Sequence, residues 1–127
     1  MKEKMKITLI WVIIGLAFIT GLVFFAVRAT APGKLDNFAQ CLKTQGVIFY
    51  GAFWCPHCQK QKSWFVSSAQ YLPYIECSTP DGQGQLAICT QNKVNSYPTW
   101  VFKDGSRLTG ETPLADLAAK TGCVLPQ

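Results

Sequence analysis

Two cysteines one helical turn apart, Cys55 and Cys58, are the residues whose types and spacing point most directly to chemistry. They close the run Gly51-Ala52-Phe53-Trp54-Cys55-Pro56-His57-Cys58. Pro56 suits the first turn of a helix, because its missing N–H is not needed there and its φ is already helical. Cys55 then falls at the N-cap, where unpaired N–H groups and the helix dipole favour a thiolate. The run therefore predicts a redox-active dithiol.

The two cysteines are expected to have different roles. His57 adds a donor or a positive charge beside the N-cap, so Cys55 is the predicted nucleophile. Cys58 lies three residues later on the same helical face, close enough for an internal disulfide, and is the predicted resolving thiol. The candidate catalytic residues are Cys55, Pro56, His57 and Cys58.

Other uses of this cysteine pair are less consistent with the sequence. A zinc site needs a second pair of ligands, but the other four cysteines stand singly and His57 is the only histidine. A c-type haem requires a histidine where Gln59 stands. A purely structural disulfide does not account for Pro56 and His57, which tune reactivity. We predict no metal and no cofactor.

The segments around the dithiol have the patterns of alternating helices and strands. A compact run of β-forming residues, 47–50, ends just before the dithiol, at the position where α/β sheets place their chemistry. Further strands are expected at 73–77, 99–102 and 107–109, with an Asp104-Gly105 hairpin before the last. Helices are expected at 36–44, 86–93 and after Thr112-Pro113 as far as Gly122, and the dithiol helix should continue through 59–71.

The N-terminal region is apolar and differs from the rest of the 127-residue chain. The uncharged run 7–27 is long enough to span a bilayer, which takes roughly twenty residues. Ala29-Thr30-Ala31 resembles a signal-peptide cleavage site, but Pro32 directly after it disfavours cutting. We expect an uncleaved anchor in residues 1–33 and one small domain in residues 34–127, with a cleaved signal as the alternative.

Charge and cysteine content indicate where the domain works. Of the net charge of +5, residues 1–32 carry +3 and the remainder only +2, which argues against a nucleic-acid partner. Three lysines precede the apolar run, so the N-terminus is expected in the cytoplasm. The six cysteines without metal spacing imply an oxidising compartment outside it. The expected location is the bacterial inner membrane, crossed once, with the domain facing the periplasm or the cell exterior.

From Phe49 to about Lys120 the sequence resembles the thioredoxin fold. The resemblance rests on 53–58, on Tyr97-Pro98-Thr99 and on 102–105. It implies an α/β fold, a thioredoxin-like three-layer sandwich with a small mixed sheet, here preceded by a single transmembrane helix. It also implies that Pro98 is cis beside the dithiol and that the backbone before it pairs with an extended substrate. Trp54, Tyr97 and Pro98 are the candidate substrate-binding residues.

Residues 49–58, 74–77 and 97–100 further resemble the thioredoxin-like domain that accompanies bacterial vitamin K epoxide reductase homologues. The Cys55-Pro56-His57-Cys58 motif is similar to that of the periplasmic oxidase DsbA. These resemblances imply a quinone-linked membrane partner and unfolded secreted protein thiols as substrates. One position departs from thioredoxin: Phe49 replaces the buried aspartate that serves the resolving cysteine, so a thioredoxin-like proton relay is not expected.

Three pairings of the other four cysteines are conceivable. Cys77 and Cys89 flank a Gly-rich connection and are the natural pair to close it. Cys41 and Cys123 then remain, on the first and last helices, which are neighbours in the fold that the sequence resembles. We expect both disulfides to be structural: on a chain-entropy estimate the bond across the short loop contributes about 3 kcal/mol and the bond across most of the domain roughly 4 kcal/mol or slightly more. Electron shuttling through Cys77 or Cys89 is the alternative.

The leading hypothesis is a membrane-anchored thiol-disulfide oxidase that a vitamin K epoxide reductase-like membrane protein recharges. A reductase or isomerase would keep the chemistry and reverse its direction. A different class, a copper metallochaperone, would bind through Cys55, His57 and Cys58.

Overall fold

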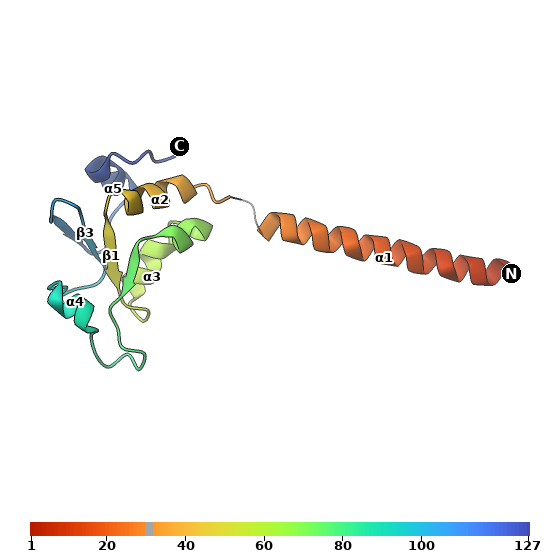
Figure 1. The fold of residues 1–127 in the computed structure, drawn as a ribbon, viewed down its shortest axis with the longest axis horizontal. Coiled ribbons are helices and arrows are strands. Elements are labelled where there is room, and N and C mark those ends of the chain that lie inside the picture. The colour runs from red at the N-terminus through yellow and green to blue at the C-terminus, as the bar shows by residue number, and fades with distance from the viewer. Residues whose placement is uncertain (30–31) are drawn as a thin grey trace. The chain divides into compact units, whose positions relative to one another are not determined.

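The protein is described here by a computed structural model, which covers residues 1–29 and 32–127. The described chain forms two compact units, Met1–Pro32 and Gly33–Gln127 (Figure 1). The expected boundary after residue 33 lies one residue from this division. The predicted cleavage-like segment Ala29-Thr30-Ala31 includes residues 30 and 31, which lie outside the described residues.

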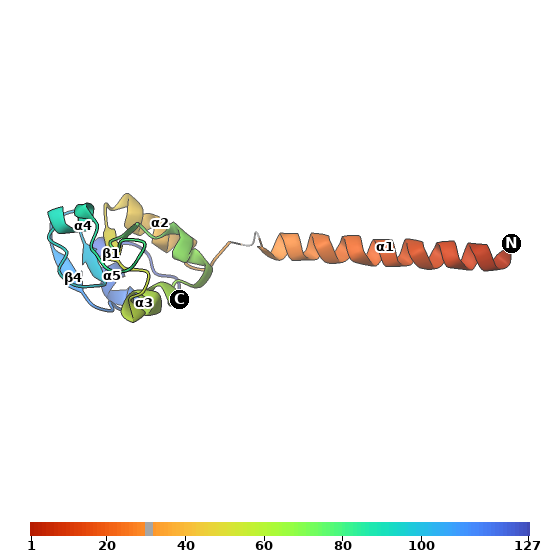
Figure 2. The ribbon, with the colours of Figure 1, turned by 90° about the horizontal axis from the view of Figure 1, so that it is seen from below.

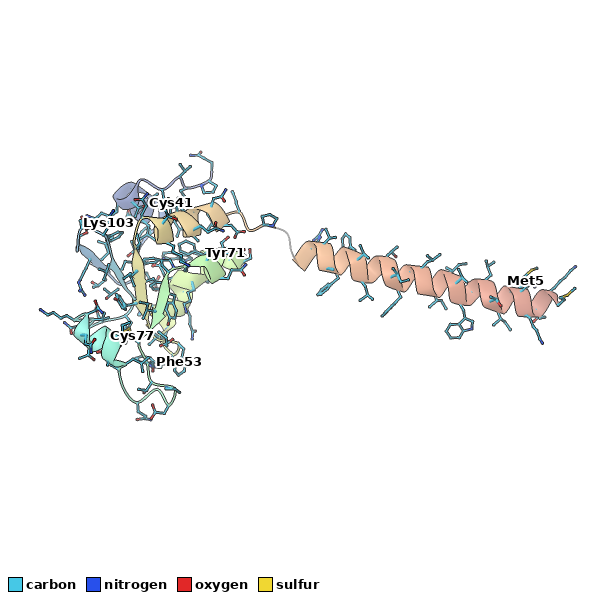
Figure 3. All side chains as sticks on the ribbon, in the orientation of Figure 1. Met5, Cys41, Phe53, Tyr71, Cys77 and Lys103 are labelled. Atoms are coloured by element: carbon cyan, nitrogen blue, oxygen red, sulfur yellow. A yellow bond between two sulfur atoms is a disulfide. The ribbon has the colours of Figure 1, made fainter. Side chains whose placement is uncertain are left out.

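The first unit is a single helix, α1 (Lys2–Ala29). Its apolar side chains project from all sides and are largely exposed (Figure 3). An apolar helix without a polar face has no water-facing side, as is typical of a segment placed in a bilayer. By length and composition, Lys2–Arg28 could cross a membrane.

The second unit is built on a four-stranded mixed sheet in the order β2-β1-β3-β4. The strands are β1 (Ile48–Gly51), β2 (Tyr74–Glu76), β3 (Thr99–Val101) and β4 (Arg107–Thr109). β1 pairs in parallel with β2 and antiparallel with β3, and β3 and β4 form the predicted hairpin. The central strand β1 therefore carries the chain directly into the dithiol.

Five helical segments surround this sheet (Figures 1 and 2). They are α2 (Asp36–Thr44), α3 (Pro56–Ser63), the 3-10 helix η1 (Val66–Tyr71), α4 (Ala87–Gln91) and α5 (Leu114–Thr121). Gly122 ends α5 with φ +73°, a left-handed conformation that glycine adopts without a steric penalty.

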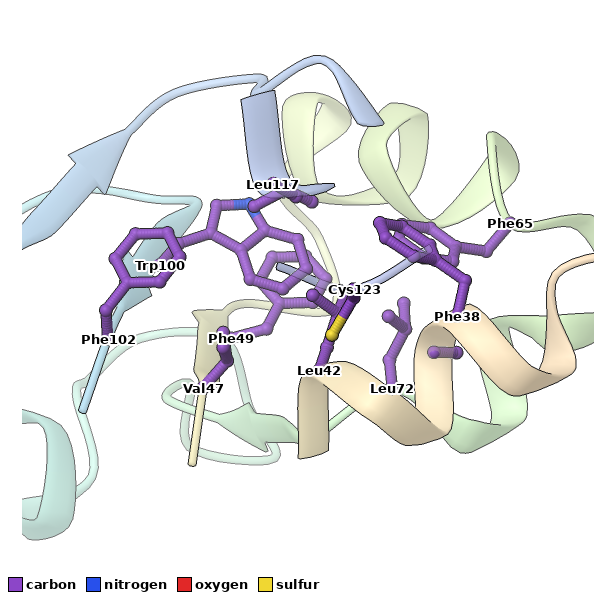
Figure 4. Packing of buried hydrophobic residues seen from close by; sticks show 11 residues of the cluster. Phe38, Leu42, Val47, Phe49, Phe65, Leu72, Trp100, Phe102, Leu117 and Cys123 are labelled. Atoms are coloured by element: carbon purple, nitrogen blue, oxygen red, sulfur yellow. The ribbon is translucent and has the colours of Figure 1, made fainter. Parts of the chain in front are cut away.

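The two faces of the sheet are buried in separate apolar clusters, because successive side chains of a strand point to opposite faces. On one face Phe49 stacks on Trp100 at 4.3 Å between centroids. Phe38 of α2, Phe65 just before η1 and Leu117 of α5 complete this cluster (Figure 4). On the other face Tyr50 packs with Cys77, Cys89 and Val94. The layers are helix, sheet and helix, as the sequence predicted.

Two local expectations were wrong. The dithiol helix does not run on to Tyr71: α3 ends at Ser63, and a separate helix, η1, begins at Val66 with φ +51°. This break places Phe65 in the core, fully buried, while Val66 is exposed. Thr112 does not cap α5 with its side chain. Instead its backbone N–H donates to the buried Gln61 amide at 2.6 Å, which ties the start of α5 to α3.

Candidate active site

Cys55 is the N-cap residue of α3, where the sequence placed it. Its Sγ accepts a hydrogen bond from the backbone N–H of Cys58 at 3.4 Å. The same sulfur lies 3.8 Å from the carbonyl oxygen of Tyr97, to which the thiol donates. A sulfur at this position faces the unpaired N–H groups of the helix start, which interact more strongly with an anion than with a neutral group.

Cys58 lies deeper than Cys55, and both are unpaired thiols. The side chain of Cys58 is 1% exposed, against 5% for Cys55. Burial raises the pKa of Cys58 to about 12, and the neighbouring Cys55 adds to this effect. A backbone hydrogen bond from Ala52 and the charge of Lys62 act in the opposite direction. Cys58 is thus protonated at neutral pH.

His57 has a partner that the sequence did not predict. Its Nδ1 lies 2.8 Å from Oε1 of Glu111, which stands between β4 and α5. The imidazole is largely exposed, and His57 stands between Pro56 and Cys58 in the sequence. The carboxylate contacts the ring at Nδ1 and so holds its orientation.

The two aromatic residues before the dithiol form an exposed apolar rim. Phe53 (labelled in Figure 3) and Trp54 are each 49% exposed. Trp54 donates its indole N–H to Ser78 Oγ at 2.8 Å and meets Tyr97 edge to face. The rim therefore rests on the connection between Cys77 and Cys89 and is held in place by it.

The loop before β3 faces the dithiol from the other side. The Tyr97–Pro98 peptide bond is cis, and Pro98 is fully buried. Thr99 donates its hydroxyl to the Ser96 carbonyl at 2.7 Å, which closes the turn. Of the predicted site residues, the structure thus brings Cys55, Cys58, Trp54, Tyr97 and Pro98 to one end of the sheet.

Both expected disulfides are present in the structure. Cys77 is joined to Cys89, so the bond spans the loop beneath Trp54. Cys41 on α2 is joined to Cys123. Cys123 was expected on the last helix, but it follows α5. Among residues 1–29 and 32–127, no group of three or more histidine, cysteine or acidic side chains could hold a metal ion.

A group of polar side chains behind Cys58 was missed at the sequence level. It consists of Lys62, Tyr74 and Glu76 (hereafter the β2 polar group), with Lys62 contributed by α3. Tyr74 donates its hydroxyl to Glu76 Oε2 at 2.7 Å, and Lys62 Nζ lies 3.2 Å from the centroid of the Tyr74 ring. The predicted strand 73–77 was the one sequence signal for this group. Residues at the end of a strand lie beside those at the end of the neighbouring strand, here β1.

The fold and the free dithiol at a helix N-terminus define a thioredoxin-type thiol-disulfide oxidoreductase. The thioredoxin family matches residues 29–121, and the chain belongs to that family.

The chain is similar to the thiol-disulfide oxidoreductase LTO1 of Arabidopsis thaliana, with 42% identity over 94 residues, 70% of this chain and 24% of LTO1. It is also similar to protein disulfide-isomerase A5 of Bos taurus, with 31% identity over 74 residues, 53% of this chain and 14% of that protein. The chain thus spans a quarter or less of these relatives. Among solved structures, oxidised mitochondrial thioredoxin 3 of Saccharomyces cerevisiae has 21% identity and a TM-score of 0.38, covering 71% of this chain and 90% of that one.

Proposed function

We propose that this protein is a membrane-anchored thiol-disulfide oxidase of extracytoplasmic proteins, with Cys55 as the attacked sulfur and Cys58 as its disulfide partner. In each cycle a substrate thiolate attacks Cys55, the Cys55–Cys58 bond breaks, and Cys58 leaves as a thiol. A second substrate thiolate then attacks the substrate sulfur, which releases the substrate disulfide and leaves Cys55 and Cys58 reduced.

The observation that carries the oxidising direction is the hydrogen bond from the Cys58 N–H to Cys55 Sγ at the start of α3. A sulfur that receives a helix N–H is stabilised most when it is a thiolate, that is, in the reduced protein. Stabilising the reduced form makes the disulfide more oxidising. The buried Phe49 also supports the oxidising direction, because it supplies no carboxylate beneath the dithiol.

The test is the reduction potential of the Cys55–Cys58 pair, measured by equilibration with glutathione buffers. We expect a value well above that of thioredoxin, about −270 mV. A value at or below the thioredoxin potential would reverse the proposed direction and make the protein a reductase. The Cys41–Cys123 and Cys77–Cys89 bonds should remain intact through the titration, which mass spectrometry of the alkylated protein can check.

Anchoring and the electron acceptor form the second part of the proposal. Helix α1 supports a single membrane crossing, and the two disulfides are consistent with an oxidising compartment. The likeness of the dithiol region to domains that accompany vitamin K epoxide reductase homologues supports such a quinone-linked protein as the acceptor. Co-purification of the Cys55→Ser and Cys58→Ser variants with membranes containing a candidate homologue would test the partner, since one of them should form a covalent complex with it.

Substrates are proposed to bind between the aromatic rim and the Tyr97 loop. Phe53 and Trp54 offer exposed apolar surface, and the backbone at Ser96 and Tyr97 can pair with an extended chain. Main-chain pairing requires no particular side chain, so it suits many unfolded proteins. Pro98 has no N–H to offer near the sulfurs. We further propose that the protein is located in a bacterial inner membrane, with the domain outside the cytoplasm.

A further inference from the structure

The cysteine that resolves the mixed disulfide is deeply buried, and its thiolate therefore needs compensation. Resolution begins when Cys58 loses its proton and its sulfur attacks Cys55. A thiolate at a site only 1% exposed has little access to water, and burial raises its pKa to about 12. The apolar Phe49 on β1 provides no charge there. Some other group must lower the cost of this anion.

Tyr74 of the β2 polar group lies beside Cys58. A Cβ added at Gly51 would lie 2.9 Å from Cys58 Sγ and 2.8 Å from Cε2 of Tyr74. The missing side chain of Gly51 thus lets the sulfur and the tyrosine ring approach one another. Lys62 stands one helical turn after Cys58 on α3, with its ammonium over the same ring.

We propose that Lys62 is a positioning residue for the resolving step: its charge, held in place by Tyr74 and Glu76, stabilises the Cys58 thiolate. Glu76 is itself fixed, because its Oε1 accepts the backbone N–H groups of Phe53 and Ser78. The Tyr74 ring binds the ammonium by its face, and its hydroxyl binds Glu76. The group thus links the base of the aromatic rim to the resolving sulfur.

The charges around Cys58 are consistent with this assignment. Cys55 on α3 opposes a thiolate at Cys58, and Lys62 on the same helix favours it. Glu76 on β2 and Cys58 on α3 both act to keep Lys62 charged, against a burial that lowers its pKa. Tyr74 has a raised pKa and stays neutral. His57 is paired with Glu111 and is not part of the group.

The proposal rests on the dithiol function and can be tested apart from it. Reduced protein reacts with an aromatic disulfide reagent, bis(nitrobenzoate) disulfide, in two phases. Cys55 first displaces one coloured thiolate and forms a mixed disulfide. Cys58 then attacks Cys55, the Cys55–Cys58 bond forms, a second coloured thiolate leaves, and the Cys58 proton passes to water. The second phase reports the resolving step alone.

In Lys62→Met the first phase should be unchanged and the second slower at neutral pH. Each pKa unit gained by Cys58 should slow it about three- to fourfold, because the loss of thiolate is partly offset by greater nucleophilicity. The pH profile of the second phase should move to higher pH, and Lys62→Arg should restore much of the rate. Lys60→Met, the same change two residues earlier on an exposed part of α3, is the matched control.

The outcomes are distinct. A second phase in Lys62→Met with the parent's rate and pH profile would overturn the role of Lys62. A loss of rate at every pH alike, without rescue by arginine, would show that Lys62 acts only through packing and would also overturn it. Absence of any second phase in the parent protein would instead contradict the proposed function. Thermal unfolding of each variant establishes that it is folded.

Discussion

The division of roles between Cys55 and Cys58 follows from their surroundings. Cys55 receives a helix N–H and borders the Tyr97 loop, whereas Cys58 is sealed beneath it. Only a sulfur that a bulky protein substrate can approach is able to form an intermolecular disulfide. The attacked sulfur is accordingly Cys55, and Cys58 acts only within the chain.

This assignment predicts that Cys58→Ser accumulates mixed disulfides through Cys55 when mixed with an unfolded protein that contains disulfides. Attack survives in this variant, but resolution is lost. Non-reducing electrophoresis should show a covalent adduct that a reductant dissolves. Cys55→Ser is the matched control, and an equal yield of adduct from it would mean that the two roles are reversed.

His57 is predicted to make the disulfide more oxidising, because its charge favours the Cys55 thiolate, which exists only in the reduced protein. His57→Ala should lower the reduction potential of the pair by about 15 to 30 mV, equivalent to about 0.7 to 1.4 kcal/mol. Glu111→Gln should shift it in the same direction by less, since the carboxylate holds the imidazole in place through the 2.8 Å contact. An unchanged potential in His57→Ala would show that the helix N-terminus alone stabilises the thiolate.

At the scale of elements, the Cys41–Cys123 bond ties α2 to the segment after α5 across 82 residues of sequence, whereas Cys77–Cys89 closes only 12. A longer closed loop restricts the unfolded chain more strongly. Replacing both Cys41 and Cys123 with Ser should lower the free energy of unfolding by about 4.5 kcal/mol, and the Cys77/Cys89 replacement by about 3 kcal/mol.

Urea unfolding of the two double variants measures this difference. The Cys41/Cys123 variant should keep the reduction potential of the parent, because its bond lies away from the dithiol. The Cys77/Cys89 variant should shift activity as well as stability, since its loop holds Trp54 through Ser78. Equal losses of stability would indicate that native packing, and not loop length, sets the effect of each bond.

Elements with strong local signals were predicted closely from the sequence. The 36–44 helix has the expected limits because a one-faced apolar pattern specifies it locally. The 107–109 strand has the expected limits because an Asp-Gly turn precedes it. The break at Val66 could not be predicted, since a valine rarely takes a positive φ. Val66 takes one here, next to the fully buried Phe65. The pairing of Gln61 with Thr112 likewise joins residues 51 positions apart, and no local pattern encodes it.

Contacts between residues far apart in the sequence also limited the prediction of the site. Cys55, Cys58 and Pro98 carry recognisable spacing, but the β2 polar group has none, because Lys62, Tyr74 and Glu76 meet only when β2 is placed beside β1. Glu111 reaches His57 from 54 residues further along the chain. Tertiary placement, and not residue type, makes these four residues part of the site.

The proposed anchor and the chemistry belong to separate units of the molecule, Met1–Pro32 and Gly33–Gln127 respectively. Every residue of the proposed mechanism lies in the second unit. Deletion of residues 1–32 is therefore expected to leave the reduction potential and the two-phase dithiol reaction unchanged. Flotation with phospholipid vesicles should recover the full chain and not the shortened one, and a shortened chain that still floats would place membrane binding in the second unit.

The Cys41–Cys123 bond also has a consequence for biosynthesis. A ribosome makes Cys41 first, then Cys55, Cys58, Cys77 and Cys89, and only then Cys123. Four incorrect partners for Cys41 are therefore made before Cys123 exists. An oxidant that acts on the growing polypeptide would produce mispaired isomers, so correct maturation favours oxidation after synthesis or a step of disulfide reshuffling. Formation of the Cys41–Cys123 bond is therefore expected to depend on thiol-disulfide exchange with another protein.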